Sequence, residues 1–159
     1  MKQISLVAMT IAALWVGVAA ADADTTVVHV SAAAGWVVTG FWVEPGQTYA
    51  VSAVGRAFTT MPNNPFFRPQ PRNASGREGE SGPEGQIYIC VDAPGFTCAL
   101  EGAPFGQLVG AVGGTAFAIG DASTFTVPAN ASAGYLALAV NDYLGYYDDN
   151  SGGYVVTLG

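Results

Sequence analysis

The part of the sequence best suited to chemistry is a run of acidic and amide side chains near the C-terminal end. Between Leu138 and Tyr154 lie three carboxylates and two carboxamides, namely Asp142, Asp148, Asp149, Asn141 and Asn150. No Lys, Arg or His occurs from Glu78 to Gly159, so the neighbouring sequence cannot neutralise this loop. Clustered acids without local bases either lie in water or hold a cation.

Calcium is the cation that suits this run. Ca²⁺ takes roughly six to eight oxygen ligands from carboxylates, amides, backbone carbonyls and water. Asp142, Asp149 and Asn150 offer side-chain oxygens, and Gly145 permits a sharp turn that lets carbonyls near Tyr146 point inward. The spacing is not that of an EF-hand. A solvated Asp/Asn/Gly turn is the alternative interpretation, because such turns are common.

Catalysis has little support in the sequence. His29 is the only histidine and lies in a predicted strand, so no Ser-His-Asp or Cys-His arrangement can form. The chain has no P-loop, dinucleotide fingerprint or metalloprotease motif. A small glycoside hydrolase that uses Asp142 with Asp148 or Asp149 is the remaining enzymatic hypothesis. The short chain offers little material for a substrate cleft, and we predict a protein that is not an enzyme.

Short runs rich in Val, Thr and aromatic residues recur between turn signals, and none has the 3.6-residue period of a helix. Gly113-Gly114 is typical of a tight hairpin turn. This pattern predicts an all-β fold, an antiparallel β-sandwich of jelly-roll-like or galactose-binding-like type. The expected strands are 26–30, 36–43, 48–54, 87–91, 107–112, 115–119, 124–127, 135–140 and 154–158.

The N-terminal residues are expected to be a secretory signal peptide and not part of the fold. A basic start at Lys2 precedes an apolar run from Ile4 to Val18, and Ala21-Asp22-Ala23 fits a small-x-small cleavage site. An uncleaved anchor is the alternative, but the run is short for a membrane span. We therefore expect residues 1–23 to be removed, residues 24–159 to form one domain, and the product to be secreted, periplasmic or on the cell surface.

The mature chain keeps 11 acidic and 4 basic residues, a formal charge of −7. Such an acidic chain argues against nucleic acid and anionic membranes as partners, and is compatible with cations and neutral ligands. No membrane span is expected in the mature form, and a homo-oligomer is compatible with the sequence. Cys90 and Cys98 form an even pair in an exported chain, which predicts a disulfide; two free thiols are the alternative.

One long segment has no strand pattern. From Thr59 to Gly85 the chain is rich in Pro, Gly and Arg, and we predict a loop without a strand there. Trp36 and Trp42 lie six residues apart in a predicted strand, so alternation would place both on one face. Core packing is the favoured interpretation of that pair, with a sugar-stacking role as the alternative.

The order of motifs resembles that of the galactophilic bacterial lectin family (LecA-like lectins). The resemblance is carried by Tyr135-Leu-Ala-Leu-Ala-Val-Asn-Asp142, then Gly145, Tyr147 and Asp149-Asn150-Ser151-Gly152, and an alternating final strand. Val51-Ser-Ala-Val-Gly55 and Gln86-Ile-Tyr-Ile-Cys90 follow in the same order as in the family. The similarity covers most of the mature chain, and its most specific part is the acidic loop.

The resemblance implies a secreted lectin in which Ca²⁺ bridges the protein and two sugar hydroxyls. The implied metal ligands are the side chains of Asp142, Asp149 and Asn150 and the backbone carbonyls of Tyr146 and Thr59. The implied sugar contacts are Asp142, Asp149, Gln86 and Pro83. The partner would be a neutral carbohydrate of galactoside type.

Two departures weaken the galactose expectation but not the calcium expectation. The family has a His-Pro pair before its glutamine, whereas this chain reads Gly82-Pro83-Glu84-Gly85. Position 149 is Asp where the family has Asn, which adds negative charge. The rival hypothesis is an exported structural or adhesive β-sandwich whose loop is stapled by calcium and binds no sugar.

Overall fold

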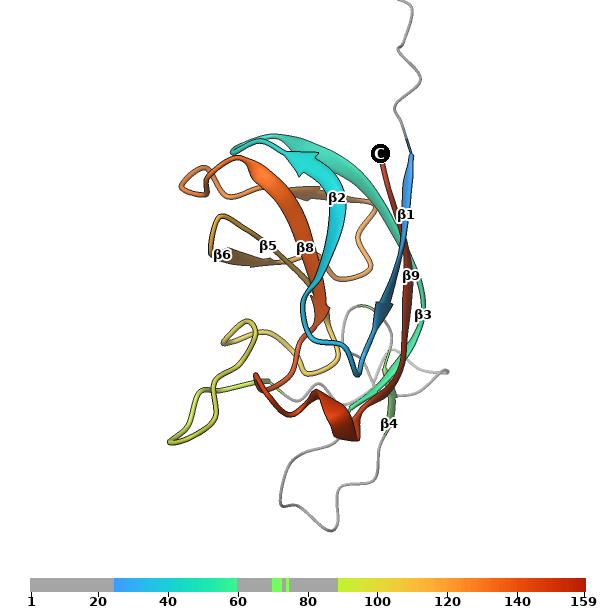
Figure 1. Cartoon of the computed structure of the whole chain (residues 1–159), viewed down its shortest axis with the longest axis vertical. Coiled ribbons are helices and arrows are strands. Elements are labelled where there is room, and N and C mark those ends of the chain that lie inside the picture. The colour runs from blue at the N-terminus through green and yellow to red at the C-terminus, as the bar shows by residue number, and fades with distance from the viewer. Residues whose placement is uncertain (1–24, 60–69, 73, 75–88) are drawn as a thin grey trace, which may run out of the picture.

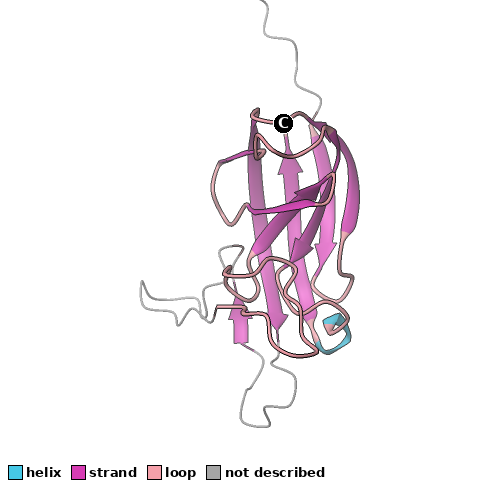
Figure 2. Cartoon of the chain, turned by 90° about the vertical axis from the view of Figure 1, so that its left-hand side faces the viewer, coloured by secondary structure: helices cyan, strands magenta, loops and turns pink. Residues whose placement is uncertain are grey.

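Two antiparallel β-sheets pack face to face in the computed structural model, which describes residues 25–59, 70–72, 74 and 89–159 (Figures 1 and 2). The elements in chain order are β1 (Thr26–Ser31), β2 (Val37–Val43), β3 (Thr48–Thr59), β4 (Gln70–Arg72), β5 (Leu108–Val112), β6 (Thr115–Ala118), β7 (Thr124–Thr126), β8 (Gly134–Val140), the 3₁₀ turn η1 (Tyr147–Asp149) and β9 (Ser151–Leu158). The predicted all-β sandwich is confirmed.

Strands that are distant in sequence pair within each sheet. The five-stranded sheet has the order β1-β9-β3-β4, with β7 paired to the start of β3. The four-stranded sheet has the order β2-β8-β5-β6, and every pair in both sheets is antiparallel. The last strand, β9, therefore lies between β1 and β3, while β8 lies between β2 and β5. This order brings the β8–β9 connection to one end of the sandwich (Figure 1).

The core lies between the sheets and is built by alternate residues of the strands. Val30, Val156 and Leu158 come from the five-stranded sheet, and Leu136 and Leu138 from the four-stranded sheet; each is at most 1 % exposed. Alternation of period two sends one side of each strand inward, which is the signal by which the sequence predicted them. Fully burying each such aliphatic side chain contributes about 1.5–3 kcal/mol.

Two glycines let the central strand β9 approach its neighbours closely. A Cβ at Gly152 would lie within 2.3 Å of the Arg56 carbonyl oxygen on β3, and one at Gly153 within 2.2 Å of the Val30 carbonyl oxygen on β1. Both residues have positive φ, 73° and 146°. A side chain at either position would collide with the backbone of the neighbouring strand. The three strands can therefore pair at this point because these residues are glycine.

The hairpin prediction is confirmed, since Gly113 and Gly114 join β5 to β6 with φ of 55° and 81°. Positive φ at both central residues is the requirement of a type I′ turn. Two other predictions are wrong. Strand β3 does not stop at Val54 but continues to Thr59, because Gly55 adopts a φ of 127° inside the ladder with β9.

The second wrong prediction is that the segment 59–85 holds no strand. Gln70–Arg72 forms β4, which pairs with the end of β3. Pro71 is tolerated because β4 is an edge strand. The expected strand at 87–91 is an isolated bridge between Ile89 and Pro104 within the described residues.

The core-packing interpretation of the tryptophan pair is also wrong for Trp42. Trp36 precedes β2, and the register of β2 against β8 shifts between Val38 and Trp42, with Gly40 at a φ of 77°. Alternation continues through this shift, so Trp42 lies on the exposed side of β2 together with Val38 and Gly40. Trp42 is 51 % exposed and does not belong to the core.

The predicted signal peptide (1–23) and most of the predicted 59–85 loop lie outside the described residues. Across the part of the chain that is described, no helix is long and apolar enough to span a membrane.

Candidate functional site

The buried polar side chains gather at one end of the sandwich. Within the described residues they are Thr59, Asn141, Asp142 and Asn150, each at most 6 % exposed. Strand β8 leads into Asn141 and Asp142, and β9 begins directly after Asn150, so the loop between these strands holds three of the four. Buried polar groups cost free energy unless they are paired, and their concentration at one place marks a functional candidate.

Asp142 is fully buried and is held by N–H donors. Its Oδ1 accepts a hydrogen bond from the backbone N–H of Tyr143 at 2.6 Å, and its Oδ2 accepts one from Asn150 Nδ2 at 2.8 Å. The same Nδ2 also donates to the carbonyl of Ala32 at 3.3 Å. The Asn150 side chain thereby ties the carboxylate to the end of β1.

Thr59 reaches the same place from β3. Phe58, the residue before Thr59, pairs with Ser151, the residue after Asn150, so the end of β3 lies next to the start of β9. Thr59 is 1 % exposed, and its Oγ1 has no hydrogen-bond partner. A buried hydroxyl without a partner requires an explanation, and a water or cation within the site would supply one.

Tyr147 closes the inner side of the loop. Its ring is buried against Gly35, where an ideal Cβ would lie 3.3 Å from the ring. Burial, with a smaller contribution from the nearby charge of Asp142, raises the pKa of Tyr147 to about 12. The phenol is therefore neutral at ordinary pH. Its hydroxyl is a second buried polar atom without a partner.

The outer side of the loop forms a surface hollow of about 380 Å³. Gly145, Tyr146, Asp148 and Asp149 line it. Both carboxylates are exposed, and both belong to the single turn η1, which turns the chain from the hollow back toward β9. The hollow thus presents negative charge to the solvent on the loop that also holds Asp142 and Asn150.

A disulfide hairpin braces the loop from the side. Cys90 and Cys98 are bonded, with Cα atoms 6.0 Å apart, so the predicted disulfide is confirmed. Cys98 forms an isolated bridge with Tyr143, and the adjacent N–H of Ala99 donates to the Asp142 carbonyl at 2.9 Å. The ring of Phe96 packs 5.1 Å from those of both Tyr143 and Tyr146.

Asn141 is a structural residue of this site whose role the sequence did not reveal. Its Oδ1 accepts from the N–H of Leu100, and its Nδ2 lies 3.0–3.1 Å from the carbonyls of Leu100, Ala103 and Pro104. The partners lie about forty positions earlier in the chain, so no local pattern identifies them. The one local indication of this role was the position of a carboxamide side chain at the end of a core strand.

The structure brings together some of the predicted ligands. Asp142 and Asn150 are in direct contact, and Thr59 ends β3, whose Phe58 pairs with Ser151 at the start of β9. Tyr146 and Asp149 line the hollow on the outer side of the loop. Gln86 and Pro83, the other predicted sugar contacts, lie outside the described residues.

The donor set fits a cation of calcium type. Within the described ranges, no three His, Cys, Asp or Glu side chains gather closely enough to hold a metal by themselves. A cation here would depend on amide, carbonyl and water oxygens as well as carboxylates, which is the mixture that Ca²⁺ accepts and that softer metals avoid. The unpartnered Thr59 hydroxyl is a further polar atom at this place.

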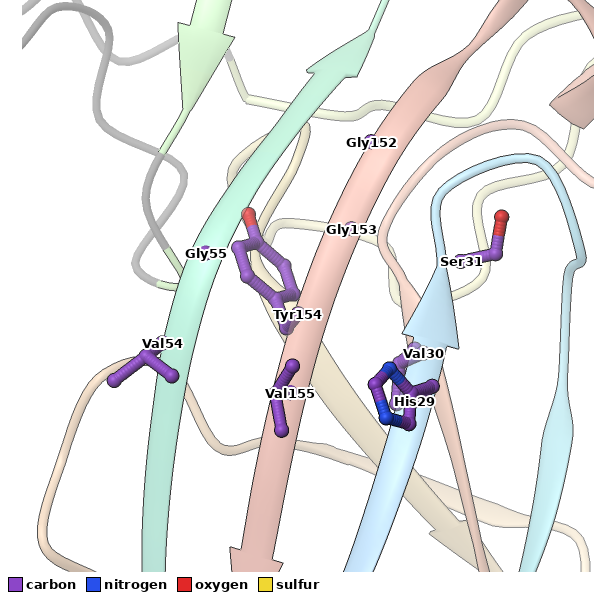
Figure 3. Close-up of a pocket in the computed structure, with 9 residues that line it drawn as sticks. All are labelled: His29, Val30, Ser31, Val54, Gly55, Gly152, Gly153, Tyr154 and Val155. Atoms are coloured by element: carbon purple, nitrogen blue, oxygen red, sulfur yellow. The ribbon is translucent and has the colours of Figure 1, made fainter.

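A second hollow, of about 290 Å³, lies over β1, β9 and β3 (Figure 3). His29, Val155 and Val54 stand in one row across the three strands. Gly55, Gly152 and Gly153 also line this hollow. Among the described residues its lining contains no carboxylate, so it offers no side-chain arrangement for calcium.

Comparison with known proteins gives a structural match. No protein-family model matches the chain, and no curated protein matches it. Among solved structures, the chain is similar to "EclA N-terminal domain; PllA-like lectin", with a TM-score of 0.55 and 20 % sequence identity over 84 % of this chain and 93 % of that domain. At this identity the likeness concerns the fold, and the β-sandwich of this chain is one that a lectin domain also adopts.

Proposed function

We propose that the mature chain is an exported, calcium-dependent carbohydrate-binding protein and not an enzyme. The observation that carries the proposal is the fully buried carboxylate of Asp142, held by Asn150, at the end of a sandwich whose fold a lectin domain shares. The acidic hollow on the outer side of the same loop offers a place for a neutral, hydroxyl-rich ligand.

The residues have separate tasks in this proposal. Asp142, Asp149 and Asn150 would hold the cation through side-chain oxygens, and Tyr146 and Thr59 through backbone carbonyls. The bound Ca²⁺ would supply a Lewis-acidic centre that exchanges water for two sugar hydroxyls. Asp142 and Asp149 would orient those hydroxyls by accepting hydrogen bonds, because carboxylates are strong acceptors. Gln86 and Pro83 remain the proposed outer sugar contacts, and a galactoside remains the proposed sugar type.

Calcium titration with two matched variants tests the cation. At about 100-fold excess over the dissociation constant, Ca²⁺ should stabilise the chain by about 2.7 kcal/mol, and EDTA should reverse the effect. Asp142→Asn should abolish this response in thermal unfolding. Asp148→Asn removes the same charge from the same loop without removing a proposed ligand, and it should keep the response. Equal behaviour of the two variants would exclude the assignment of Asp142.

A glycan array with Ca²⁺ and with EDTA tests the sugar. Binding that requires Ca²⁺ and is lost in Asp142→Asn would support the proposal. The rival function is a structural or adhesive surface protein, which the brace of the disulfide and Asn141 favours because it orders the loop without a ligand. A large effect of EDTA on the melting temperature with no glycan bound in any condition would favour that rival.

A further inference from the structure

An exposed aromatic pair lies on the outer face of the four-stranded sheet. Trp42 on β2 and Tyr135 on β8 are cross-strand partners and are 51 % and 59 % exposed. Their rings meet edge to face, with centroids 5.3 Å apart and planes at 90°. Two large aromatic side chains left in water on one sheet face are a recognised sign of a binding surface.

Open space lies next to this pair. Val38, Gly40 and Trp42 are successive outward positions of β2, and Gly40 has no side chain between the other two. An ideal Cβ built on Gly40 would meet no atom within 4 Å. On β8, the residue opposite Val38 is the small Ala137. The outer face therefore carries no large side chain at Gly40 and Ala137, and exposed apolar and aromatic side chains lie next to these positions.

A carboxylate fixes the indole and adds a polar edge. Trp42 Nε1 donates to Glu44 Oε1 at 2.7 Å, which restricts the orientation of the ring. Glu44 is exposed, and a carboxylate that accepts one hydrogen bond has further acceptor positions. The surface thus combines a rigid aromatic face with a hydrogen-bond acceptor at its edge.

We propose that Trp42, Tyr135 and Glu44 form a second carbohydrate-binding site that needs no calcium. A pyranose ring has a face of C–H groups that complements the electron-rich face of an aromatic ring. Its hydroxyl groups can donate hydrogen bonds to a carboxylate. The gap at Gly40 leaves space for a ring beside the indole. The ligand class is a neutral polysaccharide or oligosaccharide. This is also the ligand class of the proposed function, but the second site lies elsewhere on the molecule and uses no cation.

Other classes of occupant fit the surface less well. The chain carries a charge of −7, and Glu44 adds a negative group at this place, which disfavours anionic polymers. A stable protein partner buries a total of about 1,200–2,000 Å². The exposed large apolar side chains of this face that β2 and β8 contribute are Val38, Trp42 and Tyr135, which are too few for the apolar centre of such an interface.

The second site is separated from the acidic loop by the length of β8. Tyr135 lies near the start of that strand and Asp142 lies two residues beyond its end. Seven residues of strand span about 23 Å, so one monosaccharide cannot reach both places. Figure 1 shows β8 joining the two ends of the sandwich. A longer glycan, or two glycans, could engage both, which would raise avidity without new contacts.

Affinity electrophoresis in EDTA tests the proposal with named probes. The mature protein is run in native gels that contain galactan, mannan, xyloglucan or mixed-linkage β-glucan. We expect retardation by at least one probe, and Trp42→Ala should weaken that binding by about tenfold or more. Trp36→Phe is the matched control and should keep the retardation. Near-UV circular dichroism establishes that each variant is folded.

The outcomes separate this site from the calcium site. Retardation in EDTA that survives Asp142→Asn but is lost in Trp42→Ala supports the second site, whatever the calcium experiments give. Retardation that disappears in EDTA, absence of retardation by all four polysaccharides, or an unchanged Trp42→Ala variant would overturn it. Concentration-dependent dimerisation that Trp42→Ala abolishes would identify a second copy of the chain as the occupant instead, and would also overturn it.

Discussion

Asn141 is expected to be the polar side chain on which the architecture around the acidic loop depends most. It is fully buried, and its single carboxamide serves the N–H of Leu100 and the carbonyls of Leu100, Ala103 and Pro104. These contacts hold the segment 100–104 against the end of β8, one residue before Asp142. The substitution Asn141→Ala would remove them all.

The magnitude follows from the contacts. A buried hydrogen bond contributes about 1 kcal/mol, and a partner left buried without a bond costs about 1–3 kcal/mol. The four contacts therefore give an expected loss of about 3–4 kcal/mol, since the groups of Leu100 are only part-buried and water can replace some of the bonds. Such a loss is a large fraction of the roughly 5–15 kcal/mol by which domains are stable.

Urea unfolding under non-reducing conditions measures this loss, and two variants make it specific. Asn130 is exposed in the turn before β8, and Asn130→Ala should change the stability by less than about 0.5 kcal/mol. Asn141→Asp keeps an acceptor for Leu100 but turns an oxygen toward three carbonyl oxygens, so it should destabilise the fold at least as much as Asn141→Ala. A loss below about 1 kcal/mol for Asn141→Ala, or near-native stability of Asn141→Asp, would refute the role assigned to this residue.

Two further substitutions test the packing of the site. Gly153→Ala should cost about 3 kcal/mol or more in urea unfolding, because φ is 146° and the new Cβ would lie 2.2 Å from a carbonyl of β1; Gly114→Ala, with no atom within 4 Å, should cost about 1–2 kcal/mol, and equal losses would contradict the steric argument. Tyr147→Phe should be neutral or stabilising, since it removes a buried hydroxyl without a partner. The phenol pKa is raised from 10.0 to about 12, so its contribution is fully present below pH 10 and is lost toward pH 12; Tyr147→Phe should lose less stability over that range than the unsubstituted chain.

The sequence predicted the elements whose signals are local. Alternating runs predicted most of the described strands, and Gly113-Gly114 predicted the hairpin between β5 and β6, because a positive φ at two successive residues is a local demand. The disulfide between Cys90 and Cys98 was predicted from an even pair of cysteines in a chain expected to be exported. These features need no knowledge of distant neighbours.

The misjudged features depend on distant neighbours. A glycine at position 55 is typical of a strand end. Strand β3 nevertheless continues through it, because every residue of β9 pairs with a residue of β3. The short strand β4 contains a proline and is stabilised by the end of β3, which the local sequence does not indicate. Trp42 was assigned to the core but lies on the outward side of β2, and which side of a strand faces the core depends on the sheet that packs against it.

In the candidate site, too, the local contacts were predicted and a contact between distant residues was missed. Asp142 and Asn150 were predicted as neighbours because one acidic loop contains both, and they are in direct contact. The proposed contribution of Thr59 came from the family resemblance, and the pairing of Phe58 with Ser151 places the end of β3 next to the start of β9. The network of Asn141 was missed, since it joins residues about forty positions apart.

The location of the buried polar groups bears on the choice between a stabilised loop and a ligand site. Stability alone favours apolar residues at a buried strand end. Burial of a carboxylate costs desolvation free energy, which burial of a Val or Leu side chain does not. The fold nevertheless buries Asp142 completely, and the chain contains no basic residue from Glu78 onward to accompany it. The neutral amide of Asn150 donates a hydrogen bond to this carboxylate and brings no opposite charge of its own. A cation would stabilise a buried carboxylate of this kind, and this is the physical reason why the calcium titration should precede every sugar experiment.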